Sequence, residues 1–401
     1  MLRTRRDLFG LDSLGLVRER PLTGTAALLA ARGHEAYVAE LQAQGRNARP
    51  PQPPGAAEIR ISSNENPLGP GRKVLDAISG KFPEAGRYPF NSTPSDRNLV
   101  EAIAAHHKVK PENVTLGAGS QEILKSAVRA FTSASRGLVT ATPTFENPTS
   151  VARRLGHPVK EVPVDAEFRL DPAGMIAAAP GAGLVFFCNP NNPTATVHPA
   201  SAVADFVTRV RSAAPEAGIL IDEAYHEYVT DPAYATAVPL AMATPNVLVA
   251  RTFSKAYGMA GMRIGYAVGQ ADTIRRLARF KMPYNVSVFG VAAAITALGD
   301  TAHIEAERRR NTEARAFTAK ALEAMGCKCT ASEGNFLFAA IPRTAREFRE
   351  ACARQGVMVG RDFPPFQQTH ARISIGTMDE MRRAVDVFRS VLATSNMAGR
   401  D

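Results

Sequence analysis

The chain of 401 residues is poor in cysteine, and its hydrophobic residues form no long run. Its four cysteines show no paired metal-binding spacing and its eight histidines are dispersed, so we expect no metal site. A reduced, cytoplasmic protein suits this cysteine content. No apolar run is long enough to span a membrane, and no internal repeat is visible. The sequence therefore argues against a metalloprotein, a membrane protein and a repeat protein.

The charge pattern argues against a nucleic-acid-binding protein. The chain has 48 lysines and arginines against 38 acidic residues, a net charge of +10. The arginines are scattered rather than clustered with aromatic residues, so phosphate-bearing ligands and a solvated basic surface explain the excess. We expect the three arginines at 308–310 on an exposed helix face. With 45% hydrophobic residues, a chain of this length can bury a large core, in two domains.

Residues 1–57 form an N-terminal extension and linker that precede the core. Arg5 and Arg6 resemble a twin-arginine export signal, but charged residues interrupt the apolar stretch that such a signal needs, so we expect no export. Residues 25–44 have helical periodicity, and a stiff proline-rich linker follows at 47–55. We expect the extension either to be a mobile arm or to pack on a dimer and cover a cleft.

Three short apolar runs predict strands of a parallel sheet. They span residues 183–188, 218–221 and 246–250. Continuous runs of β-branched and aromatic residues are typical of strands that are buried on both faces, and Cys188 is expected to be a core residue there. Each run leads into polar residues, and open parallel sheets bind ligands beyond the carboxyl ends of their strands. We therefore expect Asn192, Asp222 and Lys255 at one edge of the sheet.

The third run leads into a loop that combines an amine with groups that bind phosphate. Residues 252–255 are Thr-Phe-Ser-Lys, and Arg263 follows within the glycine-containing segment 258–265. An isolated Ser-Lys pair is usually an exposed lysine in a loop. Here two hydroxyls, a guanidinium and exposed backbone N–H groups suit a lysine that forms an imine with a phosphorylated aldehyde. The polar residues after the other two runs favour this interpretation.

Those residues suit a pyridine ring. A pyridine nitrogen stays protonated in a buried site only if an anion lies next to it, and Asp222 supplies a carboxylate. The resulting pyridinium draws electrons from a substrate carbanion. Asn192 and Tyr225 can hydrogen-bond the phenolic oxygen of such a ring, which tunes the proton affinity of the imine.

Together these motifs resemble those of class I/II aminotransferases, the fold type I enzymes that use pyridoxal 5'-phosphate. The resemblance is carried by residues 189–194 (Asn-Pro-Asn-Asn-Pro-Thr), 222–225 (Asp-Glu-Ala-Tyr) and 254–255 with Arg263. Residues 63–70 (Ser-Asn-Glu-Asn-Pro-Leu-Gly-Pro), 87–89 (Arg-Tyr-Pro) and 372–377 (Arg-Ile-Ser-Ile-Gly-Thr) narrow it to the histidinol-phosphate aminotransferase branch. The resemblance extends from about residue 59 to about residue 391.

The resemblance implies an α/β fold with two domains. The large domain has a mostly parallel seven-stranded sheet between helices and binds the cofactor, and a smaller α/β domain accompanies it. We expect the large domain at residues 89–286 and the small domain at 58–88 and 287–401. Strands of the small domain are expected at 335–338, where the phenylalanines belong to the core, and at 371–375, where Arg372 is expected to begin the strand.

The resemblance also assigns roles to single residues. The implied cofactor-binding residues are Tyr88, Gly119, Ser120, Gln121, Phe145, Asn192, Asp222, Tyr225, Thr252, Ser254, Lys255 and Arg263. The implied substrate-binding residues are Asn66, Asn335, Arg361 and Arg372. Lys255 is the catalytic Schiff-base lysine, and Phe145 stacks on the ring. Residues 119–121 open a helix, and a glycine-containing turn at a helix N-terminus is a ready anion site. Tyr88 reaches the phosphate from a partner subunit, so a homodimer is implied.

Two features depart from the pattern of the family. Ala195 stands where the family usually has glycine, and alanine resists a positive φ, so we expect a slightly altered turn. Residues 359–366 are bulkier and richer in proline than is usual. This segment lies near the implied substrate site, so it bears on the choice of substrate more than on the reaction.

The resemblance implies a transaminase that moves an amino group between an amino donor and a 2-oxo acid, with Lys255 transferring the proton. Histidinol phosphate with 2-oxoglutarate is the leading pair. An aromatic or basic amino acid stays open as the donor, because guanidinium groups such as Arg361 and Arg372 bind carboxylate and phosphate alike. An oxidase, decarboxylase or lyase reaction also stays open. A non-catalytic regulator is disfavoured, since residues 1–55 are too short for a convincing DNA-binding module.

Overall fold

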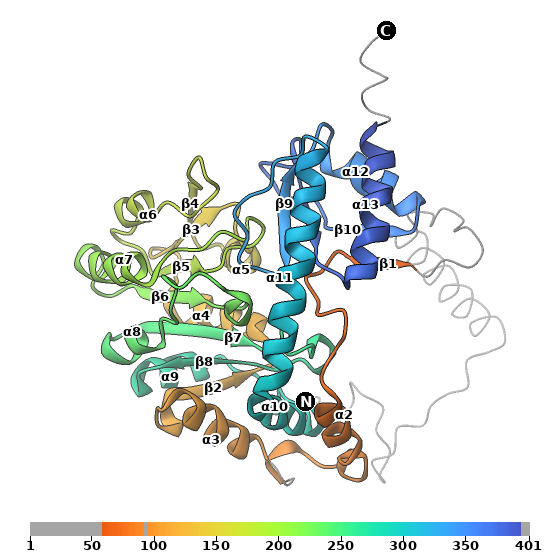
Figure 1. Ribbon diagram of the computed structural model, residues 1–401. Helices are drawn as coiled ribbons and strands as arrows, with labels where there is room; N and C mark the ends of the chain where they lie inside the picture. The colour runs from red at the N-terminus through yellow and green to blue at the C-terminus, as the bar shows by residue number, and fades with distance from the viewer. Residues whose placement is uncertain (1–57, 92–94, 394–401) are drawn as a thin grey trace, which may run out of the picture. The chain divides into compact units, whose positions relative to one another are not determined.

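The computed structural model describes residues 58–91 and 95–393 (Figure 1). The twin-arginine motif, the predicted helix at 25–44 and the linker at 47–55 lie outside the described residues. Within the described part of the chain, no helix is both long and apolar enough to cross a membrane. In the same ranges, no group of three or more His, Cys, Asp or Glu side chains is placed to hold a metal ion.

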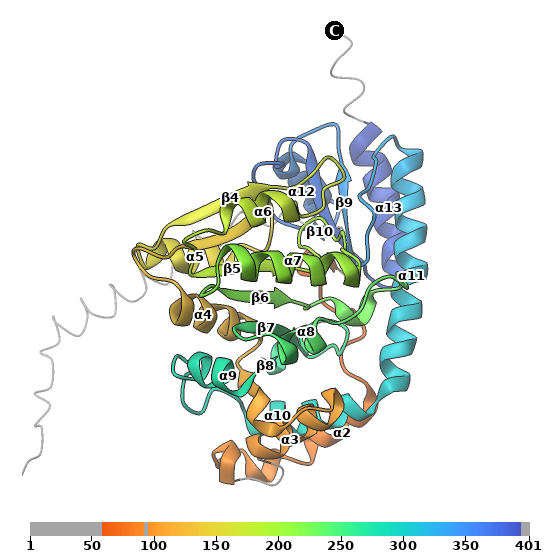
Figure 2. The same cartoon turned by 90° about the vertical axis from the view of Figure 1, so that its left-hand side faces the viewer.

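A seven-stranded sheet forms the centre of the larger part of the fold (Figure 2). In spatial order its strands are β2 (Val114–Gly117), β8 (Gly265–Gly269), β7 (Val247–Thr252), β6 (Gly218–Asp222), β5 (Leu184–Cys188), β3 (Leu138–Thr142) and β4 (Val159–Pro163). Only β8 runs antiparallel to its neighbours in this sheet. The mostly parallel sheet predicted from the sequence is therefore confirmed.

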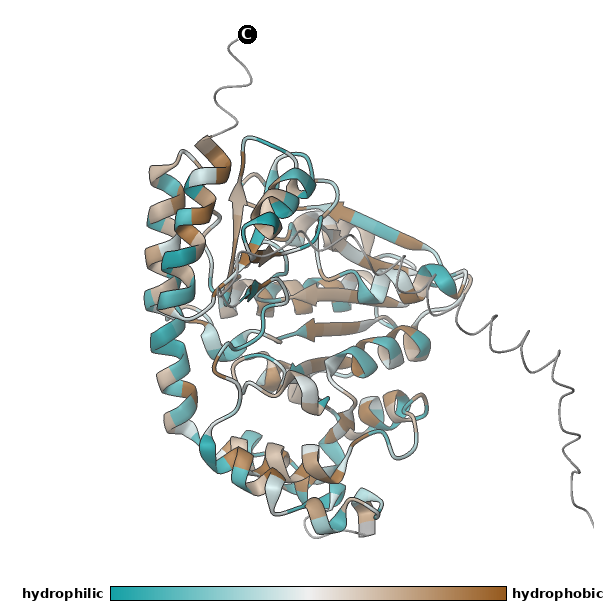
Figure 3. Ribbon diagram, turned by 90° about the vertical axis from the view of Figure 1, so that its right-hand side faces the viewer, coloured by the Kyte–Doolittle hydropathy of each residue, from teal (hydrophilic) through white to brown (hydrophobic). Residues whose placement is uncertain are grey.

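Helices cover both faces of this sheet because its central strands are apolar on both sides. In β6, for example, Ile219 and Ile221 face one core and Leu220 faces the other. The first face packs against α2 (Arg72–Ser79), α3 (Asp96–His107), α6 (Pro172–Ala178), α7 (Ala200–Ala213), α8 (Val238–Ala243) and α10 (Val288–Gly299). The second face packs against α4 (Ser120–Phe131), α5 (Asn147–Arg154) and α9 (Ala271–Ala278). The central strands of the sheet appear as apolar ribbons between mixed helices in Figure 3.

A separate core joins the start of the described chain to its end. Its elements are β1 (Ile59–Ile61), α11 (Thr301–Ala324), β9 (Phe336–Ala340), α12 (Ala345–Arg354), β10 (Val357–Val359), β11 (His370–Ser374) and α13 (Met378–Ala393). β1 pairs in parallel with β10, and β11 pairs antiparallel with β9. The predicted domain boundaries stay a prediction. However, α2 and α10, which lie outside the predicted large domain, pack into the core of the seven-stranded sheet.

Three local expectations are corrected by the structure. Ala195 adopts a φ of 60°, so the turn keeps the left-handed conformation for which glycine is the usual residue. Arg372 lies in the middle of β11 and does not begin it. The arginines at 308–310 do not form one exposed face: Arg308 Nε donates to the carbonyl of Glu227 at 2.6 Å, and only the middle arginine is exposed.

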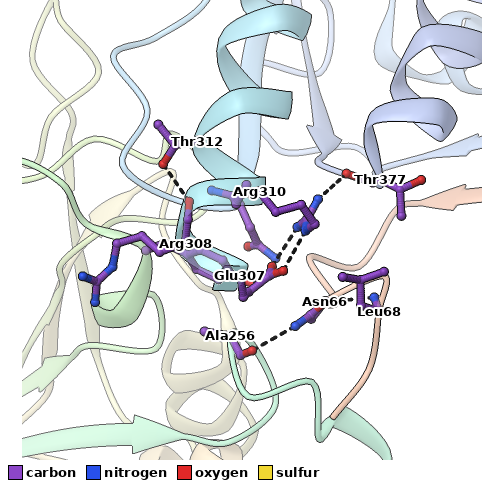
Figure 4. Close-up of polar contacts among 12 residues, drawn as sticks. Asn66, Leu68, Ala256, Glu307, Arg308, Arg310, Thr312 and Thr377 are labelled. Atoms are coloured by element: carbon purple, nitrogen blue, oxygen red, sulfur yellow. Dashed lines mark hydrogen bonds and ion pairs between the residues drawn. The ribbon is translucent and has the colours of Figure 1, made fainter. Parts of the chain in front are cut away.

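Arg310 has a structural role in the same helix. Its Nε and Nη2 each donate to the carboxylate of buried Glu307 at 2.7 Å, and its Nη1 donates to the carbonyl of Gly376 at 2.6 Å (Figure 4). Glu307 also accepts from the Tyr228 hydroxyl at 2.9 Å. These contacts hold α11 against the loop that follows β11. The charge pattern along the helix does not reveal them, because every partner except Glu307 is distant in sequence.

Candidate active site

The carboxyl ends of β5, β6 and β7 open into a cavity of about 610 Å³, which we call the lysine cavity. Twelve of the predicted site residues line it: Ser120, Gln121, Phe145, Asn192, Asp222, Tyr225, Thr252, Ser254, Lys255, Arg263, Arg361 and Arg372. The first ten come from the strand ends and adjacent turns of the seven-stranded sheet, and the two arginines come from the segment after β10 and from β11. The sheet-edge argument therefore located the cavity.

Asp222 ends β6, and its side chain is almost fully buried. Among the residues that the structure describes, none donates a hydrogen bond to its Oδ1. The pKa of this carboxyl is raised to about 7, chiefly by burial and to a lesser extent by Glu223, although the backbone N–H of Ala224 and the amine of Lys255 act in the opposite direction. A cationic N–H group that donates to Oδ1 would favour the charged, carboxylate form of Asp222. A protonated pyridine nitrogen has that chemistry.

A buried ion-pair network lies behind Asp222. Arg251 Nε donates to Glu223 at 2.7 Å and its Nη1 donates to Glu227 at 3.2 Å. All three side chains are buried. Removing one partner of such a pair leaves an uncompensated charge, so the network holds the ends of β6 and β7 in register. Sequence reasoning did not identify these residues.

The Lys255 amine lies in the same cavity. Its Nζ donates to the carbonyl of Ser63 at 3.0 Å and lies 5.7 Å from the ring centroid of Tyr225. Burial lowers the pKa of this amine to about 8, and the positive charges of Arg372 and Arg263 act in the same direction. A larger fraction of this amine is therefore uncharged near neutral pH than in an ordinary lysine, which suits a nucleophile and proton carrier.

The N-terminus of α4 forms the anion-binding end of the cavity. Gly119 precedes the helix with φ 74° and ψ 166°, and a Cβ on it would lie 2.2 Å from Arg263 Nη2. Arg263 Nη1 donates to Ser254 Oγ at 3.2 Å, and the backbone N–H of Ser254 donates to Thr252 Oγ1 at 3.1 Å. The N–H groups at the start of a helix, beside a guanidinium and two hydroxyls, suit a phosphate.

Hydrogen bonds join Asn192, Tyr225 and Arg372 into one group. Arg372 Nη1 donates to Asn192 Oδ1 at 2.8 Å, and Asn192 Nδ2 donates to the Tyr225 hydroxyl at 3.3 Å. A second amide, Nδ2 of Asn64, donates to the same hydroxyl at 3.0 Å. Asn64 was not among the predicted site residues. The signal was present, because Asn64 lies in the segment 63–70 that carries the resemblance, but the substrate role was assigned to its neighbour Asn66.

Two guanidinium groups, those of Arg361 and Arg372, line the cavity. The Cζ atoms of Arg361 and Arg372 lie 4.2 and 4.7 Å from the ring centroid of buried Phe363. Burial lowers the pKa of Arg372 to about 10, so this side chain stays charged at neutral pH. Arg361 forms an ion pair with Glu146, which the sequence analysis did not identify. The aromatic ring within the bulky 359–366 segment thus supports both cations.

Four predicted site residues do not line the cavity. Gly119 acts through its backbone at the start of α4. Asn66 is buried, donates to the carbonyl of Ala256 at 2.9 Å and accepts from Leu68 N at 2.9 Å (Figure 4). Asn335 is buried and donates to the carbonyl of Asn64 at 3.0 Å. These contacts favour structural roles for both asparagines, and their substrate roles stay predictions.

Tyr88 lies outside the cavity as well. It is 58% exposed and packs against Phe90 and Tyr284, with ring centroids 5.9 and 4.5 Å away. Its predicted contact with a phosphate would have to be made from a second subunit and stays a prediction.

Comparisons with known proteins agree with this arrangement. Residues 57–388 match the family described as aminotransferase class I and II. A histidinol-phosphate aminotransferase of Moorella thermoacetica is 36% identical over 337 residues, which cover 84% of this chain and 86% of that protein. One from Symbiobacterium thermophilum is 33% identical over 335 residues, 83% of this chain and 90% of that protein.

The fold is matched as well. The crystal structure of histidinol-phosphate aminotransferase from Sinorhizobium meliloti in complex with pyridoxal-5'-phosphate superposes with a TM-score of 0.78. It is 28% identical, and the match covers 84% of this chain and 92% of that one. The predicted fold type I architecture is confirmed, and the partnerless Asp222 Oδ1 and the glycine turn of α4 fit the ring and phosphate of this cofactor. The chain therefore belongs to the aminotransferase class I and II family, and it is a pyridoxal-phosphate-dependent transaminase.

Proposed function

We propose that this aminotransferase takes histidinol phosphate as its amino donor and 2-oxoglutarate as its acceptor. The observation that carries the proposal is the pair of guanidiniums, Arg361 and Arg372, which line the lysine cavity and both lie on the ring of Phe363. Two cations that converge on one group favour a doubly charged phosphate over a single carboxylate, since each charge-assisted contact contributes roughly 1.5–3 kcal/mol. The names of the two bacterial relatives support the same substrate.

The proposed mechanism assigns a separate task to each group of the cavity. Pyridoxal phosphate, when bound, supplies the electron-withdrawing ring on which transamination depends. The carboxylate of Asp222 holds a proton on the ring nitrogen, and Asn192 and Tyr225 hydrogen-bond the ring oxygen. Lys255 Nζ, with its lowered pKa of about 8, takes up and returns the substrate proton near neutral pH.

The remaining residues bind and orient. The backbone N–H groups of Ser120 and Gln121, with Thr252, Ser254 and Arg263, form the proposed phosphate site of the cofactor. Phe145 lies just before α5 and lines the cavity, and its proposed role is to stack on the ring.

Steady-state kinetics with four donors test the substrate proposal: histidinol phosphate, histidinol, histidine and phenylalanine. Histidinol phosphate is expected to exceed histidine in kcat/KM by at least about tenfold, the equivalent of roughly 1.4 kcal/mol. Arg361→Ala should remove most of this preference. Arg382→Ala, at an exposed arginine of α13, is the control and should leave it unchanged. If the phosphate ester is no better than the amino acids, the anion site is a carboxylate site and the enzyme is an amino-acid transaminase.

We also propose that the active unit is a homodimer in which Tyr88 completes the phosphate site of the partner subunit. The support is an exposed aromatic group made by Tyr88, Phe90 and Tyr284, which are 58%, 48% and 60% exposed. Contiguous apolar surface of this kind is typical of interfaces, and symmetric dimers are the commonest oligomers. The four free cysteines support the further proposal of a cytoplasmic location.

Mixing two inactive chains tests the shared site. A dimer of Lys255→Ala with Tyr88→Phe has one site in which both native residues meet, so an equimolar mixture should regain up to about a quarter of the wild-type activity. Each variant alone is the control. A fully active monomer in sedimentation would exclude the arrangement.

A further inference from the structure

Asn64 adopts a left-handed backbone conformation, which is uncommon for a residue other than glycine. It is buried, and its φ is 54°, in the left-handed region where glycine has no steric penalty. An ordinary L-residue in this region costs roughly 1–2 kcal/mol, and asparagine tolerates the region better than most residues. Glycine would fit the backbone more easily, so a task for the Asn64 side chain explains its presence.

Contacts with Ser374 determine which way the Asn64 amide points. The backbone N–H of Asn64 donates to Ser374 Oγ at 2.9 Å, and Ser374 Oγ lies 2.6 Å from Asn64 Oδ1. Because two oxygens need a proton between them, the serine hydroxyl must donate to Oδ1. The NH2 group therefore faces the opposite way, toward the Tyr225 hydroxyl at 3.0 Å. The two contacting residues are separated by 310 positions and belong to different ends of the described chain.

The Tyr225 hydroxyl consequently acts as a double acceptor. It accepts from Asn64 Nδ2 at 3.0 Å and from Asn192 Nδ2 at 3.3 Å. A phenol has two lone pairs and one proton, so both lone pairs are engaged and the proton is directed elsewhere. Tyr225 lines the lysine cavity beside Asp222 and Lys255. Burial raises the pKa of Tyr225, so the proton is retained at neutral pH.

We propose that Asn64 is a positioning residue that makes the Tyr225 hydroxyl a hydrogen-bond donor to the occupant of the lysine cavity, with Ser374 fixing Asn64 for this task. The inference rests on the proposed function, in which that occupant is the phenolic oxygen of pyridoxal phosphate. A donor at this oxygen stabilises its deprotonated form and lowers the proton affinity of the nitrogen joined to Lys255. Asn64 thereby tunes the cofactor without touching it.

The test is a pH titration of the absorbance spectrum of the loaded enzyme without substrate. Asn64→Gly keeps the backbone free of strain and removes the amide. Asn64→Asp keeps the shape and replaces the donor by an acceptor, which draws the tyrosine proton away from the cavity. Both should raise the midpoint of the spectral change by about one pH unit, the effect of losing one hydrogen bond. Ser374→Ala should shift it in the same direction by less.

A matched control and a reference variant separate the outcomes. Asn246 has a similar φ of 59°, but its backbone hydrogen-bonds with Ile219 and Thr273 at the other end of β7, so Asn246→Gly should leave the midpoint unchanged. Tyr225→Phe should shift the midpoint at least as far as Asn64→Gly. If Tyr225→Phe shifts it and both Asn64 variants do not, the role of Asn64 is refuted while the assignment of Tyr225 stands. If Tyr225→Phe has no effect, the assignment of Tyr225 to the ring oxygen is wrong, and this proposal is overturned with it.

Discussion

The substitution Gly119→Ala adds one methyl group and should weaken the binding of pyridoxal phosphate by disturbing the site that binds its phosphate. The residue has φ 74° and ψ 166°, a region that is essentially restricted to glycine, so alanine there costs roughly 1–3 kcal/mol of strain. The new Cβ would lie 2.2 Å from Arg263 Nη2 and 3.0 Å from its Cζ, so the guanidinium must move.

The displacement of the Arg263 guanidinium determines how much cofactor affinity should be lost. Arg263 contributes a charge-assisted contact to the proposed phosphate site, worth roughly 1.5–3 kcal/mol. Losing it should raise the Kd of the Gly119→Ala apoenzyme for pyridoxal phosphate by about 10-fold to 150-fold, since each 1.4 kcal/mol is tenfold. The strain should also lower the free energy of unfolding of the apoenzyme by up to about 3 kcal/mol.

Equilibrium titration of the apoenzyme, followed by absorbance, measures the Kd. Gly261→Ala is the matched control: it lies near Arg263, has no positive φ, and a Cβ there meets nothing within 4 Å. Pyridoxal without phosphate is the second control, because its affinity does not depend on the phosphate site. If Gly119→Ala binds pyridoxal phosphate within twofold of the wild type, or loses affinity for pyridoxal equally, the anion site is not at the start of α4.

Four further outcomes are expected. Lys255→Ala should still bind the cofactor but lose nearly all turnover, and borohydride reduction with peptide mapping should label Lys255 in the wild type; a label on another lysine would contradict this. Asp222→Asn should reduce kcat on the order of a hundredfold or more while changing cofactor Kd much less, and near-normal turnover would exclude the electron-sink role. Glu146→Gln should lower KM for the anionic donor by up to about fivefold, because a half-exposed ion pair is worth roughly 0.2–1 kcal/mol and competes for Arg361; a raised KM would mean that Glu146 binds substrate itself. Lys255 has a folded-state pKa of about 8 against an ordinary value of 10.5, so the unfolded chain binds more protons between these pH values. The wild-type apoenzyme should therefore gain stability relative to Lys255→Met as pH rises from about 8 to 10.5, and chemical denaturation at several pH values measures it; a difference that does not change with pH would show that burial does not perturb this amine.

Much of the fold was predictable because its signal is local. The apolar runs at 183–188, 218–221 and 246–250 correspond to β5, β6 and β7, with boundaries that differ by no more than two residues. Runs that are apolar on both faces require helices on both sides of the sheet. Asp222 and Lys255 follow such strands directly, so the edge rule for parallel sheets was enough to place them together.

Other parts of the site depend on contacts between distant segments, which no local pattern reveals. Asn64 and Ser374 are 310 positions apart, and Asn64 and Tyr225 are 161 positions apart. The ion pair between Glu146 and Arg361 spans 215 positions. Asn64 lines the lysine cavity and Asn66 does not, and the sequence of segment 63–70 does not show this difference.

The sequence by itself indicated the cofactor chemistry and the elements that carry it, because the amine, the carboxylate and the predicted phosphate-binding groups follow their strands or open their helix directly. The tertiary structure decided the protonation and direction of those groups. Burial sets the pKa of Asp222 and Lys255, and the fold brings Ser374 to Asn64 and so orients the Tyr225 hydroxyl. Desolvation and hydrogen-bond direction depend on every neighbour in space, and those neighbours are known only when the chain is folded.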